Sequence, residues 1–268
     1  MPELAEVAYA CSLWKKGLGK KIIEVITHPS SRVYRDEDRE QFSRDFNGTV
    51  LSHLATHGKQ MLFRFSKNRW LGIHLGMTGS LAIEQANYSP TKYDALVFRQ
   101  SKQVLVFRDP RQFGRIRVHV GKVEPKWWSD LPVSMFDRKF DLEFLKFSLS
   151  KHAKRPIKAI LLDQRYFQGM GNWMADEVLW RARIHPSLSG GKIKSHTQRN
   201  LFNEIRFVVN GAMNSIGRHG GDPPKGWLFH VRWKDGGICP STGNALVRKE
   251  IGGRTTCWCP KIQKKPGD

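Results

Sequence analysis

The spacing of apolar residues changes along the chain, and each pattern predicts a different kind of structure. Residues 3–18 carry apolar side chains at helical spacing, which predicts an N-terminal helix. From Lys20 to about Val120 the apolar residues occur in short runs rich in β-branched and aromatic side chains. Such runs, separated by polar turns, predict an antiparallel β-sandwich. The predicted strands lie in KKIIEVIT, TVLSHLATHGKQMLFRF, RWLGIHLG, DALVFRQ, QVLVFRD and RIRVHV.

The helical period returns in the second half of the chain. A segment rich in Pro, Gly and Trp, residues 121–136, separates the two patterns and predicts a domain boundary. Helices are predicted over 139–150, 155–163, 172–183 and 195–216, and strand-like pieces of a β-hairpin in WLFHVRW, NALVRKEI and RTTCWC. The predicted fold class is α+β. Its predicted domains are a β-sandwich domain at 1–122, a helical domain at 137–226 and a hairpin segment at 227–268.

The net charge of the chain indicates which classes of partner it binds. Forty-five Lys and Arg against 24 Asp and Glu give a formal net charge of +21. Such a surplus attracts polyanions, and nucleic acid comes first because each neutralised phosphate releases counterions. A ribosome-associated protein would carry a similar charge. The sequence has no apolar run of spanning length, no signal peptide and no cysteine framework typical of secreted proteins. We therefore expect a soluble cytoplasmic protein that does not bind a membrane.

The first residues, MPELAEV, have two interpretations. A proline second in the chain permits removal of Met1, which leaves Pro2 as a secondary amine beside Glu3. An α-amine titrates about two or more units below a lysine amine, so it is a good nucleophile near neutral pH. The ordinary interpretation is a helix start, where proline and acidic residues are both favoured. Taken alone, the segment favours the helix.

Three further stretches occur in a fixed order with Pro2-Glu3 and with Lys59 in HGKQMLF. They are HLGMTGSL at 74–81, DPRQFGRI at 109–116 and QGMGNWMADEVLWRARIHP at 168–186. Over nearly the whole chain, this ordered set resembles the formamidopyrimidine-DNA glycosylase and endonuclease VIII family of base-excision repair enzymes. The resemblance implies a bifunctional DNA glycosylase and abasic-site (AP) lyase acting on damaged double-stranded DNA. It also implies a helix-two-turn-helix element, and we expect a nucleoid-associated monomer.

The resemblance assigns the chemistry to the first residues. The Pro2 nitrogen would attack C1′ of a nucleotide whose base has been extruded from the duplex. The resulting iminium has no N–H to lose, so it is an obligatory cation that draws electrons during β- and δ-elimination. Glu3 would protonate the deoxyribose ring oxygen or transfer protons during elimination. Lys59 and Arg254 match the remaining catalytic positions of the family.

The resemblance also assigns the contacts with DNA. Met77, Arg111 and Phe113 would fill the gap that an extruded base leaves. Without the resemblance, Met77 is equally explained as core filling and Phe113 as an aromatic residue at a strand end, although the neighbouring glycines favour exposed loops. Asn172 lies in a GMGN turn that is either a phosphate site at a helix N-terminus or an ordinary capped turn. The other predicted DNA-binding residues are His74 and Lys158.

The C-terminal region departs from the family pattern. Many members carry a zinc finger in which two Cys-x-x-Cys pairs frame a β-hairpin, and structural zinc needs four ligands. Aligned with that pattern, this chain keeps Cys239 and Cys259 but has Thr242 and Ile262 at the other two positions. We therefore predict a zincless finger, with no metal and no other cofactor. Two further candidate ligands, both at unfavourable spacing, are Cys257 and His230.

A second departure concerns the substrate. After Gly220-Gly221 the chain reads DPPKGWLFHVRW, which is shorter than the loop that covers an everted 8-oxoguanine in formamidopyrimidine-type members. We expect weaker recognition of that purine. The alternatives are an enzyme that mainly cleaves abasic or distorted sites, a non-catalytic binder of damaged DNA and, least favoured, a general RNA-binding protein. Retention of Pro2 and Glu3 argues against a binder, because binding alone needs neither residue.

Overall fold

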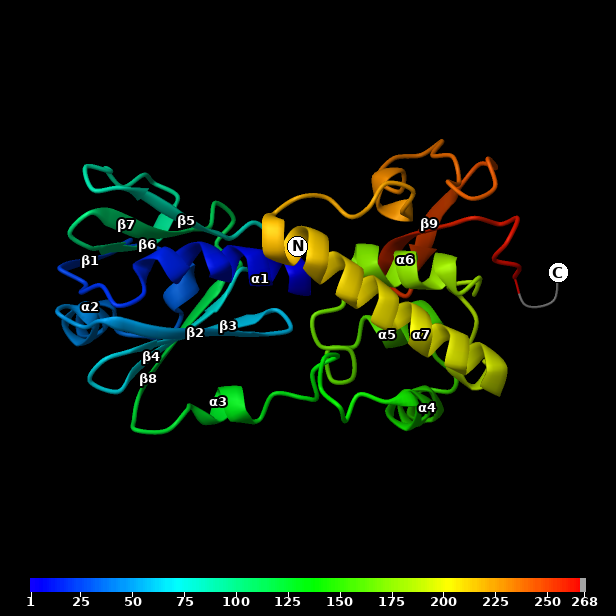
Figure 1. Ribbon diagram of the computed structural model, residues 1–268, viewed down its shortest axis with the longest axis horizontal. Helices are drawn as coiled ribbons and strands as arrows, with labels where there is room; N and C mark the ends of the chain where they lie inside the picture. The colour runs from blue at the N-terminus through cyan, green and yellow to red at the C-terminus, as the bar shows by residue number, and fades with distance from the viewer. Residues whose placement is uncertain (266–268) are drawn as a thin grey trace. The chain divides into compact units, whose positions relative to one another are not determined.

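The computed structural model describes residues 1–265, and the chain divides into two compact units, Met1–Leu131 and Pro132–Asp268 (Figure 1). The division lies inside the Pro- and Trp-containing segment 121–136. Helices and antiparallel sheets are both present, which confirms the predicted α+β class. Within residues 1–265, no helix combines the length and the apolar character needed to cross a membrane. The last three residues of the predicted hairpin segment, 266–268, lie outside the described part.

The first unit is built from two four-stranded antiparallel sheets within residues 1–131. Their strands are β1 (Glu24–Thr27), β2 (Leu51–His57), β3 (Gln60–Phe65), β4 (Arg69–His74), β5 (Ser80–Gln85), β6 (Asp94–Arg99), β7 (Gln103–Arg108) and β8 (Arg115–Val120). One sheet has the order β1-β6-β7-β5 and the other β2-β3-β4-β8. Helix α1 (Leu4–Leu13), dark blue in Figure 1, runs between them and contacts β5 and β2.

Aromatic side chains fill the space between the two sheets. Phe98 of β6 and Phe65 of β3 have ring centroids 5.5 Å apart, and Trp14, directly after α1, lies 4.9 Å from Phe63. Helix α2 (Arg39–Phe46) was not predicted, because it carries only two apolar side chains. Asp38 caps it by accepting hydrogen bonds from the first turn. The two sheets confirm the β-sandwich that the spacing of apolar residues predicted.

The second unit packs helices against a C-terminal hairpin. Its elements are α4 (Leu142–Lys151), α5 (Ile157–Leu161), α6 (Asn172–Arg181), α7 (Ser195–Ala212), β9 (Val247–Ile251) and β10 (Arg254–Trp258), and α3 (Lys126–Ser129) precedes the unit. Helix α6 packs against α7 on one side and against β10 on another. The predicted strand over WLFHVRW is wrong. That segment forms a 3-10 turn at Leu228–His230 because the backbone N–H of Phe229 is bound to Glu177 on α6, 3.1 Å away.

Candidate functional site

The N-terminal residues combine a helix start with a buried acid. Pro2 is half-buried and directly precedes α1, and the side chain of Glu3 is buried. The backbone N–H of Glu3 donates to Oε2 of Glu6 at 3.1 Å, so Glu6 satisfies a free donor at the end of the helix. The structural and catalytic interpretations are therefore compatible, because a helix start fixes the position of Pro2 and leaves its nitrogen outside the helix.

Met77, Arg111 and Phe113 lie on two loops of the first unit. Met77 is 39% exposed on the loop between β4 and β5, and Phe113 is 51% exposed on the loop between β7 and β8. The guanidinium of Arg111 lies over the Phe113 ring, 4.9 Å from its centroid. Core filling, the alternative explanation of Met77, is excluded by this exposure. Large apolar side chains exposed on adjoining loops are suited to insertion between bases.

A buried carboxylate holds the two loops together. Asp109 accepts a hydrogen bond from the Thr78 hydroxyl at 3.0 Å and another from the backbone N–H of Gly114 at 2.6 Å. Gly76 has φ +64°, and a Cβ atom on it would lie 2.4 Å from the carbonyl carbon of Phe113. The loops therefore touch through their backbones. Asp109 was not among the predicted site residues, although its position directly before Pro110 indicated a turn.

His74 and Lys59 lie near the same loops. The Nδ1 atom of His74 accepts the backbone N–H of Gly76 at 3.1 Å, which leaves the hydrogen on Nε2. Burial lowers the pKa of His74, and the charges of Lys59 and Arg117 lower it further. A neutral imidazole with Nε2–H is a hydrogen-bond donor. Lys59 is half-buried in the turn between β2 and β3.

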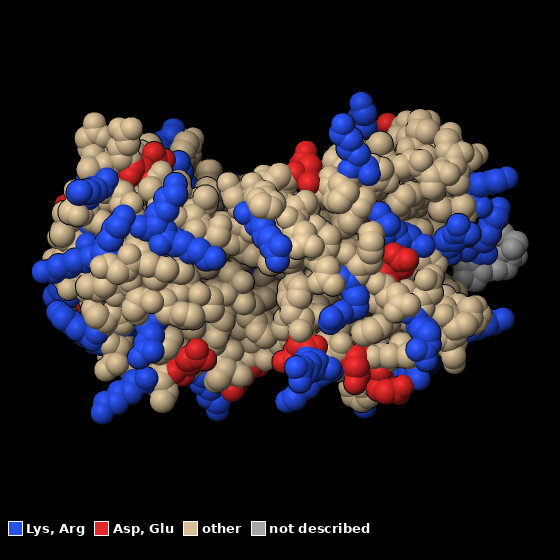
Figure 2. Space-filling view, in the orientation of Figure 1, with Lys and Arg blue, Asp and Glu red and all other residues tan. Residues whose placement is uncertain are grey.

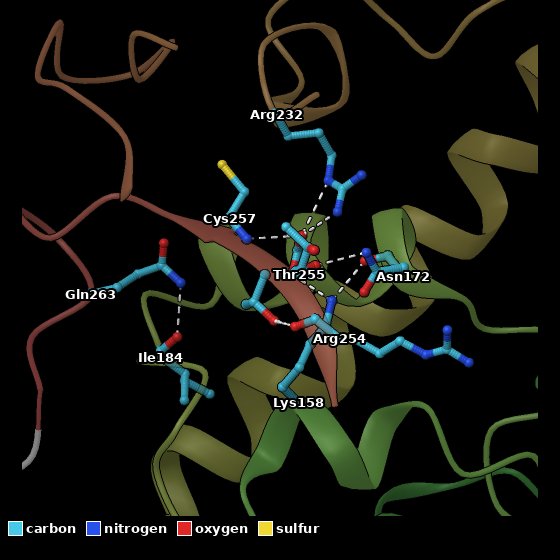
Figure 3. A network of polar contacts seen from close by, with 10 residues as sticks. Lys158, Asn172, Ile184, Arg232, Arg254, Thr255, Cys257 and Gln263 are labelled. Carbon is cyan, nitrogen blue, oxygen red and sulfur yellow. Dashed lines mark hydrogen bonds and ion pairs between the residues drawn. The ribbon is translucent and has the colours of Figure 1, made fainter. Parts of the chain in front are cut away.

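In the second unit, Asn172 and Arg254 come together although they are distant in sequence (Figure 3). Asn172 begins α6, and its Nδ2 donates to the carbonyl oxygen of Thr255 at 2.8 Å. Arg254 begins β10 and is exposed, and its side chain points away from the polar network in Figure 3. The hairpin thus carries an arginine to the N-terminal end of α6, where a phosphate is favoured by the helix dipole.

Asp176 of α6 lies at the centre of that network. Its carboxylate is buried and pairs with Lys158 and with Arg232, whose Nε lies 3.1 Å away. The backbone N–H of Cys257 on β10 also donates to it at 3.1 Å. Lys158 is completely buried and donates to the carbonyl oxygen of Asn172 at 2.7 Å. This arrangement argues against the predicted direct contact of Lys158 with DNA, because its ammonium group is already bound inside the unit.

The hairpin is seated on a small apolar core. Trp180, Leu228 and Leu246 pack there with three buried cysteines, and Ile262 adds to the same cluster. Within residues 1–265, no three His, Cys, Asp or Glu side chains are grouped so that they could hold a metal. The three cysteines of this core are Cys239, Cys257 and Cys259.

Hydrogen-bonding side chains surround Cys239 and Cys259. Burial opposes ionisation of the Cys239 thiol, but hydrogen bonds from Ser241, Thr242 and Trp180 outweigh it and lower its pKa to about 6. The Thr242 hydroxyl lies 3.5 Å from Sγ of Cys259. Each position where a ligand would stand is thus filled by a packed or hydrogen-bonded side chain.

The fold and these residues define a class: a DNA-binding repair glycosylase with a helix-two-turn-helix domain. Residues 1–116 match the family model for the formamidopyrimidine-DNA glycosylase N-terminal domain, and residues 132–220 match that for the H2TH domain of the same glycosylase. The chain belongs to the formamidopyrimidine-DNA glycosylase family. The basic side chains spread over the surface in Figure 2 agree with a DNA-binding protein.

Relatives and solved structures extend over the same length. The formamidopyrimidine-DNA glycosylase of Rickettsia massiliae is 31% identical over 277 residues, which cover 98% of this chain and 97% of that protein. The formamidopyrimidine-DNA glycosylase of Roseiflexus sp. is 31% identical over 281 residues, which cover 98% of this chain and 100% of that protein. The Lactococcus lactis enzyme, non-covalently bound to DNA with an AP site, superposes with TM-score 0.85 at 26% identity, covering 98% of this chain and 100% of that chain.

Proposed function

We propose that this chain is a bifunctional DNA glycosylase and AP lyase that removes oxidised bases from duplex DNA through its N-terminal proline. The observation that carries the proposal is the retention of Pro2 and a buried Glu3 in the unit whose loops expose Met77 and Phe113. We assign catalysis to residues 1–122 and DNA binding to 137–226 and to the hairpin segment 227–268. We expect a monomer acting at the nucleoid.

The reaction begins when the deprotonated Pro2 nitrogen attacks C1′ and the bond from C1′ to the damaged base breaks. Glu3 protonates the deoxyribose O4′, the sugar ring opens, and the nitrogen becomes an iminium cation. Loss of a proton from C2′ then expels the 3′ phosphate, and loss of a proton from C4′ in a second elimination expels the 5′ phosphate. Water finally releases Pro2 from the remaining sugar fragment. Every step uses acid-base and amine chemistry alone, so the proposal includes no cofactor.

The DNA contacts follow from charge and exposure. Met77 and Phe113 enter the gap left by the extruded base, while Arg111 reaches the base that has lost its partner. Lys59, the His74 Nε2–H, Asn172 and Arg254 bind backbone phosphates around the lesion. Buried Lys158 acts through Asn172, whose carbonyl oxygen it holds at 2.7 Å. A non-catalytic binder would need none of the N-terminal chemistry.

We expect the enzyme to prefer lesions that do not need a long loop to cover the extruded base. The segment after Gly221 is short. A contact of 2.9 Å between His230 Nε2 and the carbonyl oxygen of Pro223 restricts the conformation of this segment. Abasic and hydantoin-containing duplexes are distorted and cost less to open than a duplex with 8-oxoguanine opposite cytosine. We expect single-turnover cleavage of the former to be about 10-fold faster or more. The assay compares these substrates at one stated salt concentration; equal rates would show that loop length does not set the preference.

The hairpin should fold without metal. Thr242 and Ile262 stand where two zinc ligands would be, and both are engaged with the buried hairpin core. Elemental analysis of the purified protein should find far less than one zinc per chain, and chelators should leave its thermal unfolding unchanged. One zinc per chain, lost on chelation together with stability, would contradict this.

A further inference from the structure

The outer face of the sheet β2-β3-β4-β8 carries a pocket whose arginines have no role in the proposed function, which uses only His74 and Phe113 of its lining. Strand register places Gln60, His74 and Arg115 in one row, and Leu62, Gly72 and Arg117 in the next row. Gly72 has no side chain, and this leaves room for the Trp127 ring, which would lie 2.4 Å from a Cβ atom. The result is a pocket of about 270 Å³ lined by Arg35, Gln60, His74, Arg115, Arg117 and Trp127, with Phe113 at its edge.

This arginine pocket has a large excess of positive charge. None of the ion pairs among residues 1–265 involves Arg35, Arg115 or Arg117. The Nε atom of Arg115 is enclosed and has no hydrogen-bond acceptor in the described part of the chain. Burial lowers the pKa of Arg117, the charges of Arg115 and Arg35 lower it further, and the carboxylate of Glu37 opposes this.

Such a cluster is costly unless an anion joins it. Like charges close together repel, and an enclosed N–H without an acceptor loses its hydrogen bond to water without replacement. Glu37 gives limited relief, because it supplies one negative charge against three guanidinium groups. Arginine presents several N–H groups in a fixed plane that matches phosphate oxygens. The pocket therefore fits a phosphate group better than a carboxylate of this chain.

The neighbouring surface indicates that this phosphate belongs to a polymer. Arg35 and Phe113 also line a second hollow of about 470 Å³, to which Arg32, Arg39 and Arg111 contribute. The basic surface thus continues past the Phe113 loop, as a nucleic-acid backbone requires. On the basis of the proposed function, we propose that the arginine pocket binds a backbone phosphate of the DNA duplex, next to the base step that Phe113 enters.

The test is the salt dependence of DNA binding. The double variant Arg115→Gln/Arg117→Gln and the single variant Arg35→Asn are compared with the unchanged chain; asparagine suits position 35, where φ is 51°. Binding to a duplex with a tetrahydrofuran abasic analogue is measured by fluorescence anisotropy over a range of salt. Losing one phosphate contact should reduce the slope of log K against log salt by about 1. Affinity near 0.1 M salt should fall about 10-fold for the double variant.

The matched control removes the same charge elsewhere in the first unit. Arg69→Gln/Arg99→Gln deletes two arginines that pair with Asp45 and Glu24, and its slope should stay close to that of the unchanged chain. An equal loss of slope in this control, or an unchanged slope in both folded pocket variants, would overturn the proposal. Circular dichroism checks folding. Borohydride trapping is measured separately: absent trapping in the unchanged chain refutes the proposed function but not the pocket.

Discussion

Protein that retains Met1 should form no borohydride-trapped complex with abasic-site DNA, and removal of Met1 by methionine aminopeptidase should restore trapping. With Met1 attached, the Pro2 nitrogen is an amide, which cannot attack C1′. Once exposed, it is a secondary amine with a pKa well below that of lysine. We expect a difference on the order of 10³-fold or more in the rate of trapping. Intact mass of each sample establishes whether Met1 is present.

Two variants distinguish the contribution of the Pro2 amine from that of the neighbouring acid Glu3. Pro2→Gly with Met1 retained should not trap, and undiminished trapping there would mean that another amine, a lysine or the Met1 α-amine, is the nucleophile. Glu3→Gln, with Met1 removed, should still bind a tetrahydrofuran duplex but should excise bases about 10²-fold more slowly, because the acid for O4′ is lost. Binding by all samples to the tetrahydrofuran duplex serves as the control. It shows that a loss of trapping reflects chemistry rather than a loss of affinity.

Much of this arrangement was predictable because it depends on local sequence. The apolar period distinguishes the sandwich from the helical unit, and the glycines beside Met77 and Phe113 indicated exposed loops, which the structure confirms. The pattern failed at WLFHVRW, where alternating aromatic residues imitate a strand. There a tertiary contact decides the conformation, since Glu177 on α6 binds the backbone of Phe229. Periodicity carries no information about such a contact.

The contacts that hold the candidate site in place were hard to predict, because several of them join residues that are distant in sequence. Asp109 reaches Thr78 on the other loop only after sheet pairing has brought the two loops together, whereas Gly114 lies on its own loop. The arginine pocket depends on the register of β4 with β8, which puts Arg117 opposite Gly72. The sequence showed the individual charges. It could not show that Arg35, Arg115 and Arg117 gather on one face with Glu37 as a nearby carboxylate and, within residues 1–265, with no ion pair of their own.

The C-terminal hairpin shows the same limit, because the contacts that join it to α6 involve residues distant in sequence. Comparison with the family pattern identified the missing ligands at Thr242 and Ile262. It did not identify Asp176, which binds Lys158, Arg232 and the backbone of β10 at once. A metal in such fingers joins distant parts of the hairpin. Here a buried carboxylate joins the hairpin to α6, and Asn172 adds a second link through Thr255.

Replacing Asp176 by Asn should therefore destabilise the second unit strongly. The substitution keeps the size of the side chain but leaves Lys158 and Arg232 buried without their counter-charge, and breaking a buried pair costs roughly 3–5 kcal/mol. The free energy of unfolding is measured by urea titration, and limited proteolysis follows release of the hairpin. Glu143→Gln is the matched control, because its pair with Lys146 is exposed and should contribute less than about 1 kcal/mol.

A second variant distinguishes loss of stability from loss of position. Asp176→Leu/Lys158→Met/Arg232→Met replaces the whole buried cluster by apolar side chains, which is often neutral or stabilising. We expect it to regain most of the free energy of unfolding. The rate of DNA cleavage should stay below that of the unchanged chain. The carbonyl oxygen of Asn172 loses its contact with Lys158, and the backbone N–H of Cys257 on β10 loses the Asp176 carboxylate. A stable triple variant with full cleavage activity would show that Asp176 serves folding alone, and that Arg254 needs no such support.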